Sequence, residues 1–336
     1  MELKAGWERT KPMILPDHPT ISVLLKEILN GKSITRIEPL GGGLSNSNLK
    51  LTLQNEETIV LLIYNDGGKK AEIEKEVLQL VQGKLPVPEV FYHDFSLSTL
   101  EYPFVVLSWV DGFQLSELFQ KGDPSDLANS GNEVGRHLAE MHSIQFSSPG
   151  FFDATLNVQE FEISGAASYL AVMDEILRDR PVIQNLGSDM VHKIGQFAKE
   201  QAPLLDHLGN QSSLVHSDFN ALNILVEREG NGITVTGILD WEFAFSNSPL
   251  IDIANMLRYE NGDGSSFMGP FISSYRDNGG ILPQHWLQQA KLLDLIALCD
   301  LANKEDCGEV RLRDLQKLIR QTMNEWDSYS TIQVML

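Results

Sequence analysis

The sequence predicts an α+β fold in which strands come first and helices follow. Short apolar or alternating segments separated by turn residues fill the first third of the chain, whereas most later segments have the apolar spacing of helices. Separate runs of strands and helices are typical of α+β proteins. The length of 336 residues, with 42% hydrophobic content, suits one large domain or two lobes.

The first predicted strands flank a glycine-rich turn. An amphipathic stretch at residues 21–29 predicts a helix, and residues 33–40 and 47–53 predict two strands. Gly41 to Asn46 between them has the sequence GGGLSN. Glycines at a hairpin tip let backbone N–H groups approach phosphate oxygens, although three glycines between strands are more often an ordinary turn.

The elements after this hairpin continue the same order. Residues 59–64 form an unbroken apolar run, which predicts a buried strand, and residues 70–82 predict a helix. Prolines make residues 85–88 a rigid extended connector, and residues 103–110 predict another strand. The helices expected later in the chain span residues 129–144, 165–178, 190–208, 249–258, 285–301 and 312–326.

The segment from Leu214 to Glu242 carries the candidate chemistry. Its pattern predicts a polar loop, a strand, a Gly/Asn turn and a second strand. If the two strands pair as a hairpin, Asn223 just before the first and Asp240 just after the second emerge at the same end. Asp218 lies on the loop, five residues before Asn223.

Three oxygen-bearing side chains in this order suit phosphoryl transfer from a Mg-nucleotide. Asp218 would position and deprotonate an acceptor hydroxyl, while Asn223 and Asp240 would hold Mg²⁺. A lone Asp in a loop is usually a turn residue. Three such groups at matching spacing, with an apolar hairpin between them, favour the functional interpretation.

HSDFNALN followed by ILDWE resembles the aminoglycoside phosphotransferase and choline kinase family, small-molecule kinases with a protein-kinase-like fold. The His-x-Asp-x-x-x-x-Asn order of kinase catalytic loops matches His216, Asp218 and Asn223, and Asp240 matches the metal-binding Asp. The resemblance covers the chain from about Gly41 onward. One departure is Ser217, where the family usually has Gly.

The resemblance implies two lobes and a nucleotide between them. Residues 1–110, including the extra N-terminal helix, would form the nucleotide-binding lobe, and residues 111–336 the catalytic and substrate-binding lobe. The donor would be ATP or GTP, with the glycine-rich loop over its phosphates and a hinge strand along its adenine. The residues implied in nucleotide binding are Gly42, Gly43, Ser45, Asn46, Ser108 and Val110.

The third strand departs from the family. Kinases of this type carry a Lys or Arg there to contact the phosphates, but Leu62 takes that place and residues 59–64 contain no basic residue. Alternation predicts that Lys50 points away from the adenine side, and Lys69 and Lys70 are candidates to reach back. Glu74 resembles the helix glutamate that pairs with the missing base, although a solvated acidic helix face would explain it equally well.

Other polar residues near the motif are expected to be structural. A His within such a loop hydrogen-bonds backbone more often than it acts as a base, which applies to His216. Asp252 is expected to brace the catalytic loop, and His142 to serve packing. Acidic residues including Glu242, Glu260 and Asp294 are candidates for a cationic pocket, although charged helix residues are usually solvated.

Composition narrows the compartment and the partners. The net charge of −20 argues against nucleic acid and leaves room for a cationic small molecule. No apolar run is long enough to span a bilayer, and no signal peptide is evident at the start, so we expect a cytoplasmic protein without a membrane partner. Cys299 and Cys307 lack the spacing of a metal site and are expected to be reduced thiols.

Three functions follow from this reading of the chain. The first is an ATP- or GTP-dependent kinase acting on a small-molecule hydroxyl, with aminoglycoside, macrolide, choline, homoserine and sugar acceptors all open. The alternative is a nucleotide-binding pseudokinase or sensor without efficient catalysis, which the missing strand Lys suggests. Protein kinase activity is disfavoured, because the interval from Asp240 to Asp252 leaves no room for a long activation segment.

Overall fold

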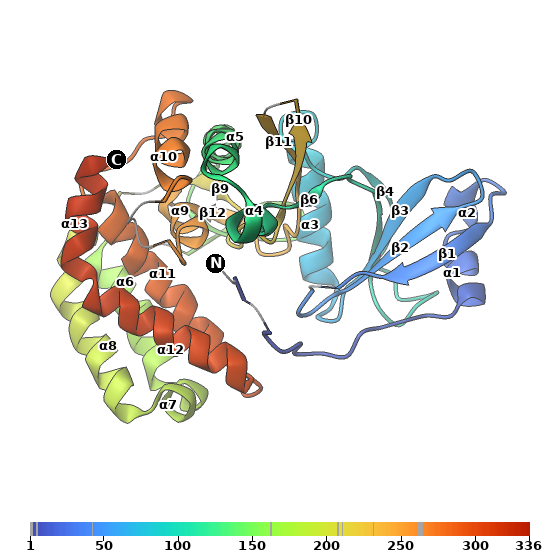
Figure 1. Cartoon of the computed structure of the whole chain (residues 1–336). Helices are drawn as coiled ribbons and strands as arrows, with labels where there is room; N and C mark the ends of the chain where they lie inside the picture. The colour runs from blue at the N-terminus through green and yellow to red at the C-terminus, as the bar shows by residue number, and fades with distance from the viewer. Residues whose placement is uncertain are drawn as a thin grey trace.

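The computed structural model describes residues 3–4, 6–41, 43–161, 163–206, 208–209, 211–230, 232–260 and 265–336. In this part of the chain a five-stranded sheet with flanking helices forms one lobe, and a larger, mainly helical lobe lies beside it (Figure 1). The predicted α+β, two-lobed architecture is confirmed. The division between residues 110 and 111 stays a prediction.

The sheet of the first lobe is antiparallel throughout, with the strand order β1-β2-β3-β5-β4. Its strands are β1 (Ile34–Pro39), β2 (Ser47–Leu53), β3 (Thr58–Ile63), β4 (Val90–Asp94) and β5 (Phe104–Ser108). Four of them, β1, β2, β3 and β5, coincide with the predicted strands to within a few residues, because alternating and β-branched residues fit a pleated, half-buried surface.

Each face of this sheet packs on different helices. Helices α1 (His18–Leu24) and α2 (Lys26–Leu29) cover the outer face, where residues such as Leu25 and Leu49 form a separate apolar cluster. Asp17 begins α1 by accepting a hydrogen bond from Thr20 N at 2.9 Å. The inner face, with Leu62 and Leu107, joins the main core together with α3 (Gly68–Val81).

The second lobe surrounds α5, which packs against α10. Asp123 starts α5 by accepting from Ser125 N and Asp126 N. A Cβ atom at Gly135 would lie 2.3 Å from Phe271 O, so only glycine permits this close approach. The helices are α4 (Leu115–Lys121), α5 (Pro124–His142), α6 (Ala166–Arg178), α7 (Arg180–Leu186), α8 (Ser188–Gln201), the 3₁₀ turn η1 (Ala202–Leu205), α9 (Leu250–Met256), α10 (Met268–Asp277), α11 (Trp286–Ala302), α12 (Glu309–Asn324) and α13 (Trp326–Met335).

Besides the large sheet, the described chain contains two smaller sheets. One has the order β11-β10-β6, with β6 (Phe113–Gln114), β10 (Ile224–Glu229) and β11 (Gly232–Ile238). The other has the order β8-β7-β12-β9, with β7 (Gly150–Phe152), β8 (Val158–Glu160), β9 (Ser213–Val215) and β12 (Phe245–Asn247). The connections β9–β10 and β11–β12 carry the predicted motif.

The described N-terminal residues extend from one lobe to the other (Figure 1). Leu3 and Trp7 are buried in the main core, and the chain then runs to α1 on the outer face of the first lobe. The sequence analysis assigned these residues to the first lobe and gave them no further role. Among the described helices, none has the length and apolarity that crossing a bilayer requires.

Candidate active site

The β10–β11 hairpin brings Asn223 and Asp240 to one end, as predicted. Ile224 pairs with Ile238, and Leu239 N donates to Asn223 O at 2.8 Å. The residues that flank this last pair of the ladder are therefore neighbours. Two oxygen-bearing side chains, separated by a turn in the sequence, reach the same edge of the hairpin.

The carboxylate of Asp218 is held beside this edge by three side chains. Asn220 Nδ2 donates to Oδ1 at 2.8 Å, and Asn223 Nδ2 donates to Oδ2 at 2.9 Å. Lys4 Nζ lies 2.9 Å from Oδ1 and forms an ion pair with it. With these partners in place the Asp218 side chain is still 23% exposed, so a further molecule has access to it.

The charge of Asp218 is stabilised by this arrangement. Burial alone would raise its pKa, but the charge and the hydrogen bond of Lys4, together with the charges of His216 and Arg258, outweigh that effect and the pKa is lowered. Asp218 is therefore ionised at neutral pH and able to accept a hydrogen bond from a hydroxyl group.

The side-chain nitrogen of Asn223 is the atom that contacts Asp218. Its Nδ2 donates to Asp218 O at 3.0 Å as well as to the carboxylate. The amide oxygen is therefore the atom that remains for a metal ion. Amide oxygens are among the hard ligands that Mg²⁺ accepts.

Asp240 completes the edge in a strained conformation. Its φ is 69°, in the left-handed region that few non-glycine residues adopt. Burial, followed by the charges of Glu242 and Glu74, raises the pKa of Asp240 well above its usual range. Such crowded carboxylates suit a divalent cation, which would relieve their repulsion.

A preformed cage of His, Cys, Asp or Glu side chains is absent from the described residues, none of which form a group of three suited to a metal. This agrees with the chemistry of Mg²⁺, which usually keeps several waters and takes one or two carboxylates plus substrate phosphates. Asn223 and Asp240 fit such a sparse site.

A buried network holds the catalytic loop from below. Asp252 accepts from the backbone N–H groups of His216 and Ser217, both at 2.8 Å, and lies 3.2 Å from His142 Nε2. His216 Nε2 contacts Leu239 O at 2.9 Å, which links the loop to the hairpin. The predicted bracing role of Asp252 and the structural role of His216 are confirmed, and His142 belongs to the same network.

The backbone at Ser217, where the family usually has Gly, adopts a left-handed conformation. Its φ is 71°, so the loop has kept a conformation that favours glycine although a serine occupies it. Asp252 Oδ1 fixes the N–H group of Ser217, and Asn255 Nδ2 donates to its carbonyl at 3.0 Å. These contacts hold the backbone in the strained conformation.

The glycine-rich loop lies close to the motif from the other lobe. Asn46 Nδ2 donates to Glu242 Oε2 at 3.0 Å, which joins the two lobes. The carbonyl groups of Gly43, Ser45 and Asn46 accept hydrogen bonds from Arg9. Gly42, which the sequence analysis assigned to phosphate binding, lies outside the described residues.

The helix glutamate has a substitute partner. Leu62 is 7% exposed and packs in the core, so the third strand offers Glu74 no cation. Tyr64 OH donates to Glu74 Oε2 at 2.6 Å, and Trp241 N donates to Glu74 Oε1 at 3.2 Å. Burial, and then the charge of Glu242, raise the pKa of Glu74 to about 7. Glu74 is thus buried, and the interpretation of a solvated helix face is wrong.

Three lysines were considered as replacements for the Lys or Arg that the third strand lacks, and they lie in different places. Lys50 Nζ sits 3.8 Å from the centre of the Trp109 ring, on the sheet face opposite Leu49. The prediction that Lys50 points away from the adenine side is wrong, because β2 turns its other face to α1 and α2. Lys70 Nζ is 3.9 Å from Glu242 Oε2, whereas Lys69 is exposed.

Some of the hydrogen-bonding groups in the predicted hinge are already used within the protein. Ser108 N donates to Glu89 O at 2.9 Å, and Ser108 Oγ accepts from Glu89 N. The Ser108 carbonyl, not its amide, is therefore the group to offer a base. Val110 packs its side chain over Gly237, where a Cβ atom would lie 3.0 Å away.

Two functional-site residues escaped the sequence analysis. Lys4 contacts Asp218, and Arg9 contacts the glycine-rich loop, from a stretch of the chain without helical or strand periodicity. Of the proposed acidic pocket, Asp294 forms an ion pair with Arg258, and Glu242 binds Asn46. Neither is unpaired, which weakens the case for a preformed cationic pocket built from them.

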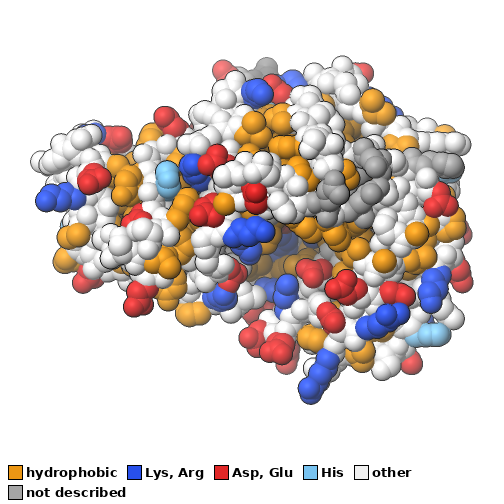
Figure 2. Space-filling model, turned by 180° about the vertical axis from the view of Figure 1, so that it is seen from behind, with side chains coloured by type: hydrophobic (Ala, Val, Ile, Leu, Met, Phe, Trp, Pro, Cys, Tyr) orange, Lys and Arg blue, Asp and Glu red, His pale blue; other side chains and the backbone are white. Residues whose placement is uncertain are grey.

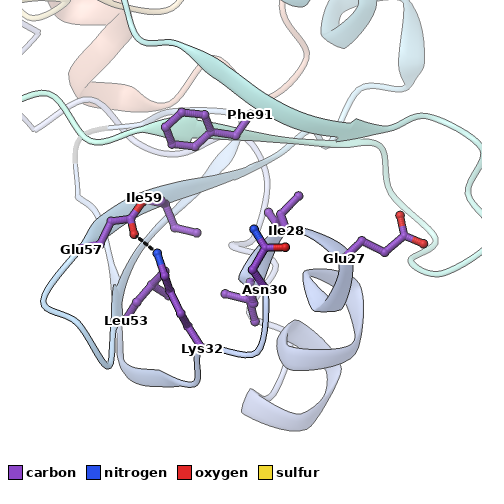
Figure 3. Close-up of a pocket in the computed structure, with 9 residues that line it drawn as sticks. Glu27, Ile28, Asn30, Lys32, Leu53, Glu57, Ile59 and Phe91 are labelled. Atoms are coloured by element: carbon purple, nitrogen blue, oxygen red, sulfur yellow. Dashed lines mark hydrogen bonds and ion pairs between the residues drawn. The ribbon is translucent and has the colours of Figure 1, made fainter.

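From behind, the molecule is hollowed between the lobes, with Lys and Arg side chains around the hollow and Asp and Glu side chains on the helical side (Figure 2). A separate cavity of about 360 Å³ lies elsewhere, on the outer face of the sheet. Ile28, Phe91 and the ion pair of Lys32 with Glu57 line it (Figure 3). It is on the opposite side of the sheet from the motif and plays no part in the site.

Comparison with protein families identifies one match. The model of the phosphotransferase enzyme family (APH) matches residues 36–286, well over half of the chain. The matched region includes the glycine-rich loop, the hinge, and all of Asp218, Asn223 and Asp240. No curated protein matches the sequence.

Solved structures show the same fold at low sequence identity. A GDP complex of a mutant aminoglycoside 2'-phosphotransferase-IIIa has a TM-score of 0.70 and 15% identity, covering 94% of this chain and 100% of that one. Aminoglycoside phosphotransferase APH(4)-Ia has a TM-score of 0.62 and 15% identity over 90% and 99%. A macrolide 2'-phosphotransferase type I has a TM-score of 0.61 and 16% identity over 92% and 99%.

Proposed function

Because the chain belongs to the phosphotransferase enzyme family, we propose that it transfers the γ-phosphate of ATP or GTP to a hydroxyl group of a small molecule. The observation that carries the proposal is the convergence of Asp218, Asn223 and Asp240 at the end of the β10–β11 hairpin. These are the groups that phosphoryl transfer requires, one for the acceptor and two for the metal.

Asp218 would act on the acceptor. Its ionised carboxylate accepts the hydroxyl proton as the hydroxyl oxygen bonds to the γ-phosphorus. The bond from that phosphorus to the bridging β,γ-oxygen breaks, and the nucleoside diphosphate leaves with the electron pair. The proton passes from Asp218 to solvent, so the products are a phosphate monoester, the diphosphate and one proton.

Mg²⁺ would be held by the amide oxygen of Asn223 and the carboxylate of Asp240. When bound it neutralises phosphate charge and orients the γ-phosphate for in-line attack. The raised pKa of Asp240, caused by burial and by Glu242, supports a site that is stable only when a cation joins it. Glu242 and Glu74 would stay outside the coordination sphere, occupied by Asn46 and Tyr64.

The nucleotide would lie between the lobes. Gly42, Gly43, Ser45 and Asn46 would cover the phosphates, and Ser108 and Val110 would hydrogen-bond the adenine or guanine edge with backbone groups. The solved relatives support a nucleotide donor, since one is a complex with AMP-PNP and hygromycin B and another with GDP and kanamycin. Both donor bases therefore occur among proteins of this fold.

The acceptor would be a small molecule with a hydroxyl group, and we favour one that carries an amine. Aminoglycosides, which the relatives bind, are polyamines, and the acidic charge of the chain attracts cations over a long range. Macrolides, amino alcohols and sugars belong in the same test, because one structural relative is a macrolide phosphotransferase.

A nucleotide-binding protein without efficient catalysis is the second candidate. It is favoured by Leu62, which puts a buried apolar side chain where kinases of this type carry the phosphate-binding base. The retained pairing of Asp218 with Asn223 argues against it, because nucleotide binding alone makes no demand on a group for the acceptor.

The test is nucleotide turnover with Mg²⁺ across a panel of aminoglycosides, macrolides, amino alcohols, homoserine and sugars. Asp218→Asn preserves the shape of the side chain but not its charge, and should lower acceptor-dependent kcat by about 100-fold to 10,000-fold. Asp174→Asn, at a surface pair with Arg178, is the matched control. Nucleotide binding without acceptor-dependent turnover over the whole panel would support the second candidate instead.

A further inference from the structure

Residues 3, 4 and 6–11, here named the N-terminal strap, connect the second lobe to the glycine-rich loop. Leu3 and Trp7 are buried in the main core at 7% and 8% exposure. Trp7 Nε1 donates to Asp314 Oδ2 at 3.0 Å, and Glu8 accepts from Val310 N at 2.9 Å. The strap is therefore packed into the second lobe over several residues and is not a loosely attached tail.

The strap also holds the glycine-rich loop. Arg9 donates to the carbonyl groups of Gly43, Ser45 and Asn46, and Thr10 N donates to Leu44 O at 3.1 Å. Carbonyl groups bound by Arg9 on one side leave the opposite side of the loop for its N–H groups. The strap thus fixes the position of the loop that would cover the phosphates.

Between the buried residues Leu3 and Trp7, Lys4 reaches the catalytic carboxylate. Its ammonium group is 2.9 Å from Asp218 Oδ1, and its side chain is 14% exposed. Among the residues that the structure describes, Asp218 Oδ2 accepts from Asn223 alone, and the Asp218 side chain stays 23% exposed. Lys4 therefore leaves one oxygen of Asp218 accessible to an acceptor hydroxyl.

Positive charge is scarce at this point. The carboxylates of Glu242, Glu74 and Asp218 all act on Asp240 here, and the third strand supplies no Lys or Arg. Two other cations nearby are engaged elsewhere: Lys70 lies between Asp66 at 3.6 Å and Glu242 at 3.9 Å, and Arg258 is paired with Asp294. A triphosphate adds further negative charge, and transition-state charge on the transferred group requires a fixed cation.

We propose that Lys4 is a catalytic residue of the transfer, in which its ammonium group contacts the transferred phosphoryl group beside Asp218. This inference rests on the proposed function. The phosphorus bonds to the same oxygen that gives its proton to Asp218, so a cation 2.9 Å from that carboxylate lies next to the reacting atoms. The ammonium group of Lys4 exchanges part of its contact with Asp218 for the phosphoryl oxygens.

The experiment uses the full chain with any purification tag at the C-terminus. It measures nucleotide binding and nucleotide hydrolysis with water as acceptor, so it does not depend on knowing the small-molecule acceptor. Lys4→Met should lower the hydrolysis kcat by about 100-fold, the usual effect of removing one transition-state contact. The KM for nucleotide should change much less, because the strap and the loop contacts of Arg9 remain.

Two further variants separate chemistry from structure. Lys11→Met removes the strap lysine that pairs with Asp66 and should leave kcat within about threefold, since a surface ion pair contributes little. Lys4→Gly should regain part of its hydrolysis rate on addition of methylammonium or ethylammonium, which a merely structural role of Lys4 would not produce. The melting temperature of each variant shows whether the strap stays in place.

The outcomes are distinct. A wild-type protein that binds no nucleotide would overturn the proposed function and this inference with it. Wild-type turnover that Lys4→Met matches would overturn this inference alone. Turnover that rises in Lys4→Met would also overturn it, and would show that Lys4 blocks the site. A kcat loss in Lys4→Met that small amines restore in Lys4→Gly would establish the catalytic role.

Discussion

The hydroxyl group of Tyr64 donates a 2.6 Å hydrogen bond to the carboxylate of Glu74. Both groups are buried, and the other oxygen of Glu74 accepts from Trp241 N, next to Asp240. The phenol therefore takes over the contact that a strand Lys or Arg would make with this helix glutamate. It ties α3 to the motif through a neutral donor and brings no positive charge into the site.

Tyr64→Phe should weaken this link. The variant keeps the ring and its packing but leaves one buried oxygen of Glu74 without a donor, which should lower the free energy of unfolding by about 1–3 kcal/mol. Turnover should fall as well, because Glu74 binds the backbone of Trp241, and a shift of Glu74 would move the adjacent Asp240. Urea unfolding measures the first effect, with Tyr92→Phe on the outer sheet face as control. Equal stability of the two variants would contradict the assigned role.

Ser217→Gly should stabilise the protein. Ser217 has φ 71°, a left-handed conformation that costs an L-residue about 1–2 kcal/mol and costs glycine little. The greater freedom of glycine in the unfolded chain offsets part of this gain. We expect a net rise of about 0.5–1 kcal/mol in the free energy of unfolding. Ser217→Ala keeps the strain and is the control, and a Gly variant no more stable than the Ala variant would contradict the argument.

The large sheet and the motif hairpin could be predicted from the sequence because their signals are local. Alternation along β2 and apolar runs in β3 and β10 specify strands, and Gly230 and Gly232 mark the turn that brings Asn223 toward Asp240. The bracing role of Asp252 followed from its place at a helix start. In each case neighbouring residues suffice for the inference.

What escaped prediction depends on contacts distant in sequence. Short helices such as α4 and α7 have too few turns to show periodicity, and packing stabilises them. The face that Lys50 occupies depends on α1 and α2 covering the other side of β2. Lys4 reaches Asp218 across 214 residues, and no local pattern in the strap marks that contact.

Lys291 should make stability depend on pH. Burial lowers its pKa to about 8 from 10.5, against the opposing charge of Asp294. Between these values the unfolded chain binds more protons than the folded one, so the free energy of unfolding should rise with pH, by at most about 1.4 kcal/mol per unit. Lys291→Met should remove this contribution, whereas Lys193→Met on the surface of α8 should not. Chemical denaturation at pH 8, 9 and 10 gives the slopes, and parallel slopes for wild type and Lys291→Met would rule the contribution out.

Arg258 and Asp294 should depend on each other for stability. Their side chains are 4% and 3% exposed, and Arg258 Nη2 lies 2.6 Å from Asp294 Oδ1. Arg258→Met would leave an unpaired buried carboxylate and should lower the free energy of unfolding by about 3–5 kcal/mol. Adding Asp294→Leu should recover most of that loss, because two apolar side chains of similar volume avoid the desolvation of both charges. A double variant as unstable as the single one would mean that the pair also maintains contacts beyond itself.

Catalysis by the same double variant then shows what the pair does for the site. Burial raises the pKa of Asp218, and the charge of Arg258 helps to lower it, although less than Lys4 and His216 do. Turnover should therefore stay within about tenfold of wild type if Lys4 supplies the main cation at Asp218. A much larger loss of turnover, in a variant whose stability has recovered, would mean that Arg258 also supplies positive charge that Asp218 needs for catalysis.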